Sequence, residues 1–164
     1  MKLTDGSRAL LKLQRANLER SSPLLSTNTH VSIERLLWGE DLETHAQGAW
    51  DIVLGADVTY AYDPNAHDAL AATFAALLDV ARRPPRIILA HEHRNRGPAV
   101  QASLRWDEHD ETLRRFGEAA HEHGLCLEQL VWEKRTPEAA KLLESGLAVP
   151  PGCHECSIIE VTRA

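Results

Sequence analysis

Hydrophobic and polar positions follow two different periods along this chain of 164 residues. Apolar runs that are typical of strands occupy residues 1–4, 31–38, 50–57, 86–90, 125–132 and 155–162. Elsewhere, apolar residues recur three and four positions apart, which predicts helices after Ser7, over residues 64–81 and over residues 111–123. The pattern therefore predicts strands that alternate with helices over most of the chain.

This alternation predicts an α/β fold with a mostly parallel sheet. Within the strand predicted at residues 50–57, the five residues 52–56 form a continuous apolar run, which is typical of a parallel strand buried on both faces. The final two strands follow each other without a dependable crossover helix, so we expect them to pair as an antiparallel hairpin at a sheet edge. Residues 1–164 are thus predicted to form a single domain, a Rossmann-like three-layer sandwich.

The charge balance bears on the partners that this chain can have. It carries 18 basic and 24 acidic residues, a formal net charge of −6, and it has no basic stripe, which argues against a nucleic-acid partner. No apolar stretch reaches the roughly 18 residues that a membrane-spanning helix needs. With 3 cysteines and no secretory segment at its start, the chain is expected to be a reduced, cytoplasmic protein, and we expect a monomer.

Three chemistry-bearing residues stand at or near the ends of predicted strands: Asp5, Trp38 and Asp57. Ligands of open parallel sheets bind beyond the carboxyl ends of the strands. The carboxylate of Asp5 could accept hydrogen bonds from both hydroxyls of a ribose, or it could cap the N-terminus of the helix that follows. Trp38 could contact an adenine ring or pack in the core. Asp57 ends an apolar run where a carboxylate is costly to bury without a partner, which favours a functional role.

Neighbouring residues extend this candidate pocket. Gly39 follows Trp38 directly, and the carboxylates of Glu40 and Asp41 could accept from an exocyclic amine. Tyr60 lies three positions after Asp57 and could place a hydroxyl or a ring over the same cavity. It could equally be a loop aromatic that closes the core.

Four segments together resemble the seven-β-strand protein-lysine methyltransferases, which use S-adenosylmethionine. They are Leu-Thr-Asp-Gly at 3–6, Arg-Ala-Asn-Leu-Glu-Arg at 15–20, Leu-Leu-Trp-Gly at 36–39 and Asp-Ile-Val-Leu-Gly-Ala-Asp-Val-Thr-Tyr at 51–60. Within that family, the chain looks most like the group that methylates a lysine of elongation factor 2. The implied fold is that of class I methyltransferases, and the implied partner is a protein substrate.

The resemblance implies a role for each candidate residue. Asp5 would bind the ribose of S-adenosylmethionine, and Trp38 with Gly39 would flank its adenine. Asp57 and Tyr60 match the Asp-x-x-Tyr signature of the family and would form the catalytic pair that lines the lysine channel, with Asp57 also near the cofactor. Such residues hold and orient the acceptor amine, which supplies much of the catalysis of methyl transfer.

The family's first strand and its Gly-rich loop would precede Asp5, and they have no counterpart in this sequence. We therefore expect an N-terminally truncated domain that binds S-adenosylmethionine weakly or not at all. A methyltransferase-like domain that acts in protein interaction is the alternative. A nucleotide-cofactor oxidoreductase is a further alternative, because Asp5 alone does not distinguish the ribose of one adenosine cofactor from that of another.

Histidines and cysteines raise the question of a metal. His91, His93, His109, His121 and His123 could suggest a metal site. On a strand His91 and His93 would face the same way, but their spacing places no carboxylate or thiol on that face with them, and we expect surface histidines. Two residues, His154 and Glu155, separate Cys153 from Cys156, which is the cysteine spacing of a zinc knuckle, but the chain lacks the second cysteine pair of such a site. We predict no metal site. Arg94-Asn95-Arg96 could bind an acidic protein substrate or form a solvated loop.

Overall fold

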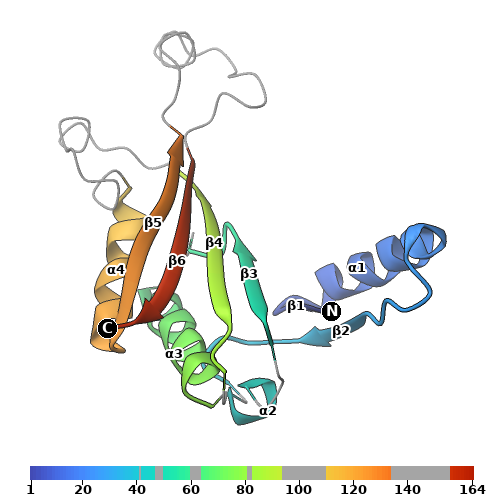
Figure 1. The fold of residues 1–164 in the computed structure, drawn as a ribbon, viewed down its shortest axis with the longest axis horizontal. Helices are drawn as coiled ribbons and strands as arrows, with labels where there is room; N and C mark the ends of the chain where they lie inside the picture. The colour runs from blue at the N-terminus through green and yellow to red at the C-terminus, as the bar shows by residue number, and fades with distance from the viewer. Residues whose placement is uncertain (41, 47–49, 60–63, 81–82, 94–109, 134–155) are drawn as a thin grey trace, which may run out of the picture.

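The computed structural model describes residues 1–40, 42–46, 50–59, 64–80, 83–93, 110–133 and 156–164. Its helices and strands follow one another as β1 (Lys2–Asp5), α1 (Arg8–Ser21), the short 3-10 helix η1 (Ser22–Leu24), β2 (Ser32–Arg35), α2 (Leu42–Ala46), β3 (Ile52–Ala56), α3 (Pro64–Val80), β4 (Arg86–Glu92), α4 (Glu111–Glu122), β5 (Leu125–Glu133) and β6 (Cys156–Arg163) (Figure 1). The predicted strands and the three predicted helices are confirmed in their predicted order.

Two boundaries differ from the pattern-based expectation. The apolar run that was expected to continue to Trp38 forms a strand only to Arg35, because the chain turns toward α3 after the strand. The polar segment between the strands predicted at 31–38 and 50–57, for which no element was predicted, contains the short helix α2. Helix α4 agrees with the prediction: Asp110 caps its N-terminus by accepting from the Thr112 N–H at 2.8 Å, and Gly124 follows its end with a φ of 66°.

The larger sheet has four strands in the order β3-β4-β6-β5. Strands β3 and β4 are parallel, whereas β6 is antiparallel to both β4 and β5. The predicted antiparallel pairing of the last two strands is therefore confirmed. Of these two strands, β5 lies at an edge of the sheet and β6 lies between β4 and β5. The ion pair between Arg86 and Glu160, at 2.9 Å, joins β4 to β6 across this antiparallel register.

Strands β1 and β2 form a separate, parallel two-stranded sheet. Strand β3 pairs only with β4 among the described strands, and its Ile52 and Leu54 side chains are 57% and 78% exposed. The expectation that this strand is buried on both faces is wrong, because no described element covers the face that carries these residues. An apolar cavity of about 290 Å³ is lined by residues of both β1 and β3, including Leu3 and Leu54.

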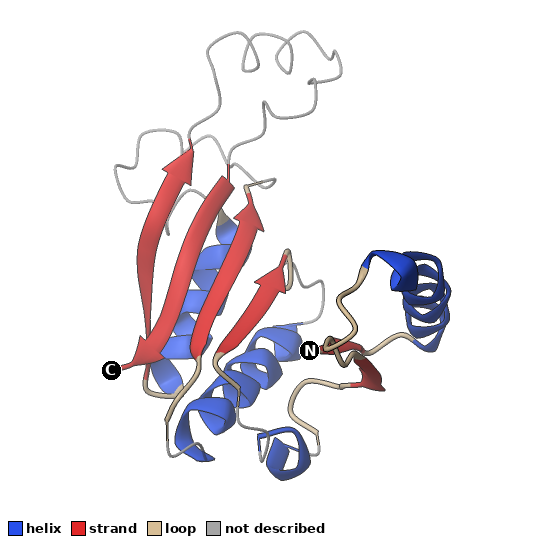
Figure 2. Cartoon of the chain, turned by 45° about the vertical axis from the view of Figure 1, so that its right-hand side comes forward, coloured by secondary structure: helices blue, strands red, loops and turns tan. Residues whose placement is uncertain are grey.

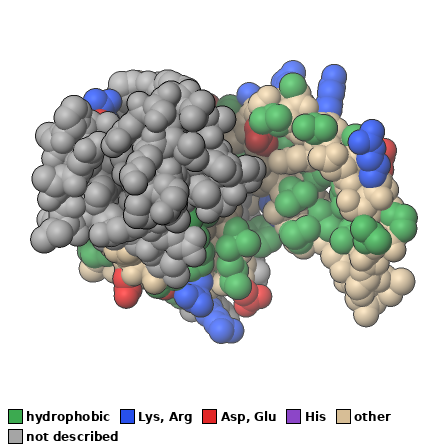
Figure 3. Space-filling view, turned by 90° about the horizontal axis from the view of Figure 1, so that it is seen from above, with side chains coloured by type: hydrophobic (Ala, Val, Ile, Leu, Met, Phe, Trp, Pro, Cys, Tyr) green, Lys and Arg blue, Asp and Glu red, His purple; other side chains and the backbone are tan. Residues whose placement is uncertain are grey.

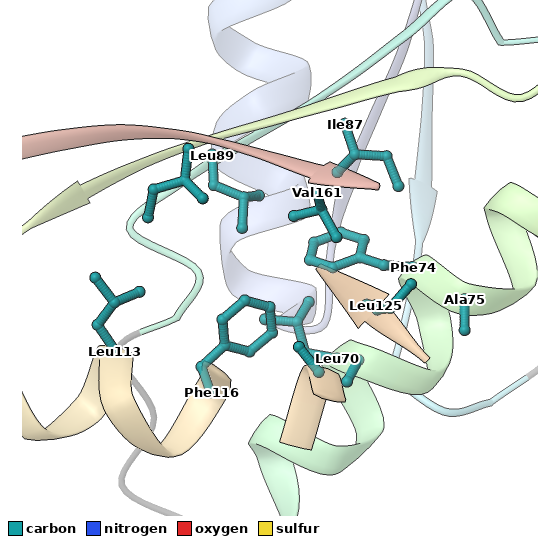
Figure 4. Close-up of a cluster of buried hydrophobic side chains, with 12 residues drawn as sticks. Leu70, Phe74, Ala75, Ile87, Leu89, Leu113, Phe116, Leu125 and Val161 are labelled. Carbon is teal, nitrogen blue, oxygen red and sulfur yellow. The ribbon is translucent and has the colours of Figure 1, made fainter. Parts of the chain in front are cut away.

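Helices α3 and α4 cover one face of the four-stranded sheet (Figure 2). Their apolar side chains meet those of β4, β5 and β6 in the core (Figure 4), which contains Leu70, Phe74, Ile87, Leu89, Leu113, Phe116, Leu125, Ile159 and Val161. Phe116 is fully buried and contacts Phe74 edge to face, with ring centroids 6.2 Å apart. This packing fixes α3, which contributes residues to the cavity described below, and β4, which holds the turn after β3.

Helix α1 packs on β1 and β2 and leaves part of its apolar face uncovered. Leu11 is buried, whereas Leu10 and Leu13 are about half exposed, at 47% and 54%. Figure 3 shows hydrophobic side chains on the described surface of the molecule. Across the described residues, no helix combines the length and apolar character that a bilayer-spanning segment needs.

Candidate functional site

A cavity of about 760 Å³ lies where β1, β2 and β3 end. Its lining includes Asp5, Trp38 and Asp57, so the structure brings these three predicted residues together. Helix α3 contributes Asn65, Ala66 and Ala69, which the sequence analysis missed. A signal for them was present, because α3 begins at Pro64, a short distance after β3 ends, and therefore starts at the same end of the sheet.

Asp5 ends β1 and turns the chain into α1. Its Oδ1 accepts from the Ser7 backbone N–H at 2.7 Å, and Ser7, rather than Asp5, is the N-cap residue of α1. The turn is held from β2, because the Arg35 Nε donates to the Gly6 carbonyl at 3.1 Å. The interpretation of Asp5 as the helix cap is therefore wrong: one oxygen of the carboxylate fixes the turn, and the side chain lines the cavity.

Trp38 combines the two roles that its sequence position left open. It is partly buried, it packs against the main core, and it also lines the cavity. A flat apolar side chain in this position can offer a surface to an adenine ring while its remaining surface stays in contact with the core.

Gly39 lies beside the cavity but does not line it. Its φ of 78° is a conformation that favours glycine, and a Cβ at this position would come within 3.2 Å of the Ala69 Cβ. Its N–H donates to the Thr73 hydroxyl at 2.9 Å. Gly39 therefore joins the segment after β2 to helix α3 and so positions Trp38.

Asp57 occupies the turn after β3 with a φ of 57°, and it is the one described non-glycine residue with a positive φ. Its N–H donates to the Ala90 carbonyl of β4 at 2.7 Å, and its Oδ1 atom is buried. A left-handed conformation of a non-glycine residue costs of order 1 kcal/mol or more and is often found at functional sites. The geometry directs a carboxylate into the cavity lining at the end of β3.

Thr59 anchors the same turn to strand β4 and helix α3. It is 1% exposed, its Oγ1 lies 2.6 Å from the Nδ1 of His91, and its carbonyl lies 2.8 Å from the Nε2 of His67. No role was predicted for Thr59 or His67, and nothing in their spacing indicates these contacts. Tyr60, the other half of the predicted catalytic pair, lies outside the described residues.

The expectation of surface histidines is wrong for His91 and His93, which are both fully buried. Strand β4 continues to Glu92, so His91 shares the inward face of this strand with Ile87 and Leu89. His121 is exposed, as expected, and the partly buried His123 contacts Asp68 at 2.7 Å. The other residues named in the predictions of a metal site and of a basic loop lie outside the described residues: His109, Cys153, His154, Glu155, Arg94, Asn95 and Arg96.

Asp110 lies against His91, with 3.3 Å between its Oδ2 and the His91 Nε2. Burial alone would raise the pKa of Asp110, but its interactions with His91 and with the hydroxyl and N–H of Thr112 outweigh burial and hold the pKa well below its ordinary value. Asp110 is therefore an ionised carboxylate inside the protein, where such a group requires partners.

We expect Thr59→Val to destabilise the protein by about 1–3 kcal/mol, because it leaves the Nδ1 of a buried histidine without its hydroxyl partner. Urea denaturation followed by circular dichroism measures the free energy of unfolding. Thr59→Ser keeps the hydroxyl and is the matched control, which we expect to lose less stability. Equal stability of Thr59→Val and the unsubstituted protein would contradict the proposed anchoring of the turn.

Solved structures share this fold at low sequence identity, and one of them is a methyltransferase domain. The methyltransferase domain of bacterial CtHen1-C superposes with a TM-score of 0.56 and 13% identity, covering 99% of this chain and 76% of that one. The YcgJ protein from Bacillus subtilis gives a TM-score of 0.52 at 9% identity over 99% of this chain and 82% of that one. These similarities establish an α/β fold of the class I methyltransferase type, with a mixed sheet and antiparallel C-terminal strands.

Sequence comparison identifies the family. The chain is 37% identical over 76 residues to Protein N-lysine methyltransferase METTL21A of Danio rerio, a match that covers 46% of this chain and 30% of that protein. The matched segment thus spans about a third of the length of the curated relative. The model of the family described as lysine methyltransferase matches residues 1–107, which is more than half of the chain. The chain therefore belongs to the lysine methyltransferase family.

Proposed function

We propose that this domain transfers a methyl group from S-adenosylmethionine to the side-chain amine of a protein lysine. The single observation that carries this proposal is the cavity at the ends of β1, β2 and β3, in which Asp5, Trp38 and Asp57 meet. S-adenosylmethionine supplies an activated methyl group on a sulfonium. The residues of this chain would bind the adenosine part and orient the acceptor amine.

The lining residues fit the adenosine part of the cofactor. Asp5 offers a carboxylate whose Oδ1 already accepts a hydrogen bond from the Ser7 N–H. An ionised carboxylate has about four acceptor sites, so it can also accept hydrogen bonds from both hydroxyls of a ribose. Trp38 offers a partly buried aromatic surface for the adenine ring. Glu40, another lining residue, can accept from the exocyclic amine. The predicted partner Asp41 lies outside the described residues.

Asp57 fits the acceptor side of the reaction. A lysine amine must be neutral when it attacks the methyl group. Its N–H can donate a charge-assisted hydrogen bond to the carboxylate of Asp57, which would hold and orient the amine. The fixed backbone of Asp57 favours this positioning role, because its N–H bond to Ala90 limits the movement of the turn. Tyr60 is proposed to complete the lysine channel with its ring and hydroxyl.

The acceptor that we propose is a protein, with elongation factor 2 as the first candidate, because the Asp-x-x-Tyr and Leu-Leu-Trp-Gly segments resemble the group of enzymes that methylate it. The assay incubates the 164-residue chain with purified elongation factor 2 or a mixture of proteins, and with tritiated S-adenosylmethionine at millimolar concentration because we expect weak cofactor binding. Tritium that is recovered as methylated lysine after acid hydrolysis supports the proposal. Labelling of a different residue type contradicts it.

Cofactor affinity tests how much of S-adenosylmethionine the residues lining the described cavity can hold. We expect calorimetry of the chain against S-adenosylmethionine to show weak or undetectable binding, because the described residues contact only one part of the cofactor in our proposal. Micromolar affinity would contradict that expectation. It would also show that the described cavity is sufficient for cofactor binding.

A second candidate function is protein interaction without catalysis. The observation that favours it is the group of exposed apolar side chains on α1 and β3, namely Leu10, Leu13, Ile52 and Leu54. Exposed apolar surface of this kind marks interaction sites in folded proteins. Absence of any labelled lysine, together with binding of a partner that is lost in Leu10→Ser/Leu13→Ser, would favour this function over methyl transfer.

A further inference from the structure

Three fully buried side chains outside the cavity form a compact polar cluster: His91 and His93 of β4, and Asp110 at the N-terminus of α4. One ligand-type atom from each residue lies within 4.8 Å of the others. The two imidazoles are close neighbours, with ring centroids 5.0 Å apart and planes at 77°. The mechanism proposed above uses none of these side chains for binding substrate or cofactor.

The distance between His91 and Asp110 matches that of two ligands of one metal ion. Bonds of about 2.0–2.2 Å from a zinc ion to nitrogen and oxygen in tetrahedral geometry place two ligand atoms roughly 3.3–3.6 Å apart. The His91 Nε2 and the Asp110 Oδ2 are 3.3 Å apart. These two atoms can therefore bind the same ion without a movement of the backbone.

Each histidine is oriented by a hydroxyl at its other ring nitrogen. Thr59 Oγ1 lies 2.6 Å from the Nδ1 of His91, and Ser157 Oγ lies 2.8 Å from the Nε2 of His93. Coordination by the Nε2 of His91 and the Nδ1 of His93 would leave both contacts in place. Metal-binding histidines in proteins commonly have such a partner on the second nitrogen, which fixes the orientation and the tautomer of the ring.

The Asp110 carboxylate is held in a similar way. Its Oδ1 accepts from the backbone N–H of Thr112 at 2.8 Å and from the hydroxyl of the same residue, while Oδ2 is directed toward His91. The cluster thus combines two imidazoles with one carboxylate, a ligand set that suits zinc and other divalent transition metals better than calcium or magnesium.

We propose that His91, His93 and Asp110 bind a divalent transition metal ion of the zinc class. The ion would join β4 to the start of α4, and through Thr59 and Ser157 it would stabilise the orientation of side chains in the turn after β3 and in β6. The three side chains would leave one position of a tetrahedral ion for a water molecule. Because they are fully buried and do not line the cavity described above, we assign the ion the role of joining these elements rather than of binding substrate. The charge of the ion would also compensate the buried carboxylate.

Zinc titration of the full chain tests this proposal. The purified protein is stripped with a chelator, dialysed against zinc chloride, and analysed for bound zinc by mass spectrometry, with Co²⁺ absorption as a second measurement of the ligand geometry. The test variants are His93→Gln and Asp110→Asn. Asparagine can still accept from the Thr112 N–H, so Asp110→Asn retains the helix cap while it removes the ligand charge.

The control is His67→Gln, because His67 is a buried histidine that contacts the same Thr59 but lies outside the cluster. We expect about one zinc ion per chain in the unsubstituted protein and in His67→Gln, and at least about 100-fold weaker binding in His93→Gln and Asp110→Asn. Ser157→Ala removes an orienting hydroxyl and should weaken zinc binding by about 10–100-fold.

Two results would overturn the proposal. The first is failure of the folded, unsubstituted chain to bind zinc or Co²⁺, which would show that the cluster is a hydrogen-bonded network alone. The second is equal zinc binding by the unsubstituted protein and by folded His93→Gln and Asp110→Asn, which would place the ion elsewhere, for example at Cys153 and Cys156. Circular dichroism of each variant shows that it is folded.

Discussion

Replacing Asp57 by Asn is expected to lower the rate of lysine methyl transfer by about 100-fold or more. Asparagine has nearly the same size and tolerates a left-handed backbone, so the φ of 57° and the N–H bond to Ala90 should remain. The substitution removes the negative charge that we propose to hold the acceptor amine. Single-turnover assays with tritiated S-adenosylmethionine and a lysine-bearing acceptor measure the effect.

Asp57→Gly separates the catalytic role of this residue from its structural one. Glycine adopts a positive φ without steric cost, which should raise the free energy of unfolding by up to about 1 kcal/mol. The flexibility of glycine in the unfolded chain offsets part of this gain. The variant should therefore unfold at an equal or higher denaturant concentration. Its methyl-transfer rate should fall as far as that of Asp57→Asn. A variant that is stable and fully active would exclude Asp57 from positioning the substrate.

Phe116→Ala is expected to reduce the free energy of unfolding by about 3–5 kcal/mol. Phe116 is fully buried between α3, α4 and the sheet, where it contacts Phe74 and lies near the His67 ring, at a centroid distance of 6.3 Å. Removing the ring leaves a cavity that the surrounding helices can close only in part. For a domain of marginal stability, a loss of this size abolishes folding at moderate temperature.

Leu54→Ala is the matched control for this core substitution. Leu54 is 78% exposed on β3, so its truncation removes little buried surface and should change the free energy of unfolding by less than about 1 kcal/mol. Urea denaturation of both variants gives the comparison. A loss for Leu54→Ala as large as that for Phe116→Ala would show that a further element covers β3 in solution.

The fold was predictable where hydrophobic periodicity is clear. Helix α4 has a regular apolar spacing with a cap residue, Asp110, before it and Gly124 after it. The apolar spacing and Gly124 predicted a helix over 111–123, within a residue of the observed bounds, and the Asp110 cap is an addition from the structure. The exposure of Ile52 and Leu54 was not predictable, because an apolar run indicates a strand suited to burial without showing whether neighbouring elements cover it.

The site was predictable to a similar degree. Asp5, Trp38 and Asp57 meet because parallel strands place their carboxyl ends at one edge, and this rule depends only on the order of strands. The anchoring of Thr59 by His91 was not predictable, because the sequence shows neither the extension of β4 through His91 nor its meeting with Asp110 across an intervening segment. Polar residues after an apolar run indicate a loop unless tertiary partners are known.

Chemical-shift mapping with S-adenosylmethionine tests most directly whether this cavity receives the adenosine part of the cofactor. Millimolar cofactor is added to the isotope-labelled chain, and the spectra are compared with those of Asp5→Ala. We predict amide shifts at Asp5, Gly6, Trp38, Glu40 and Asp57, which line the cavity, and loss of these shifts in Asp5→Ala. Shifts confined to other residues, or no shift at saturating cofactor, would contradict the proposed site.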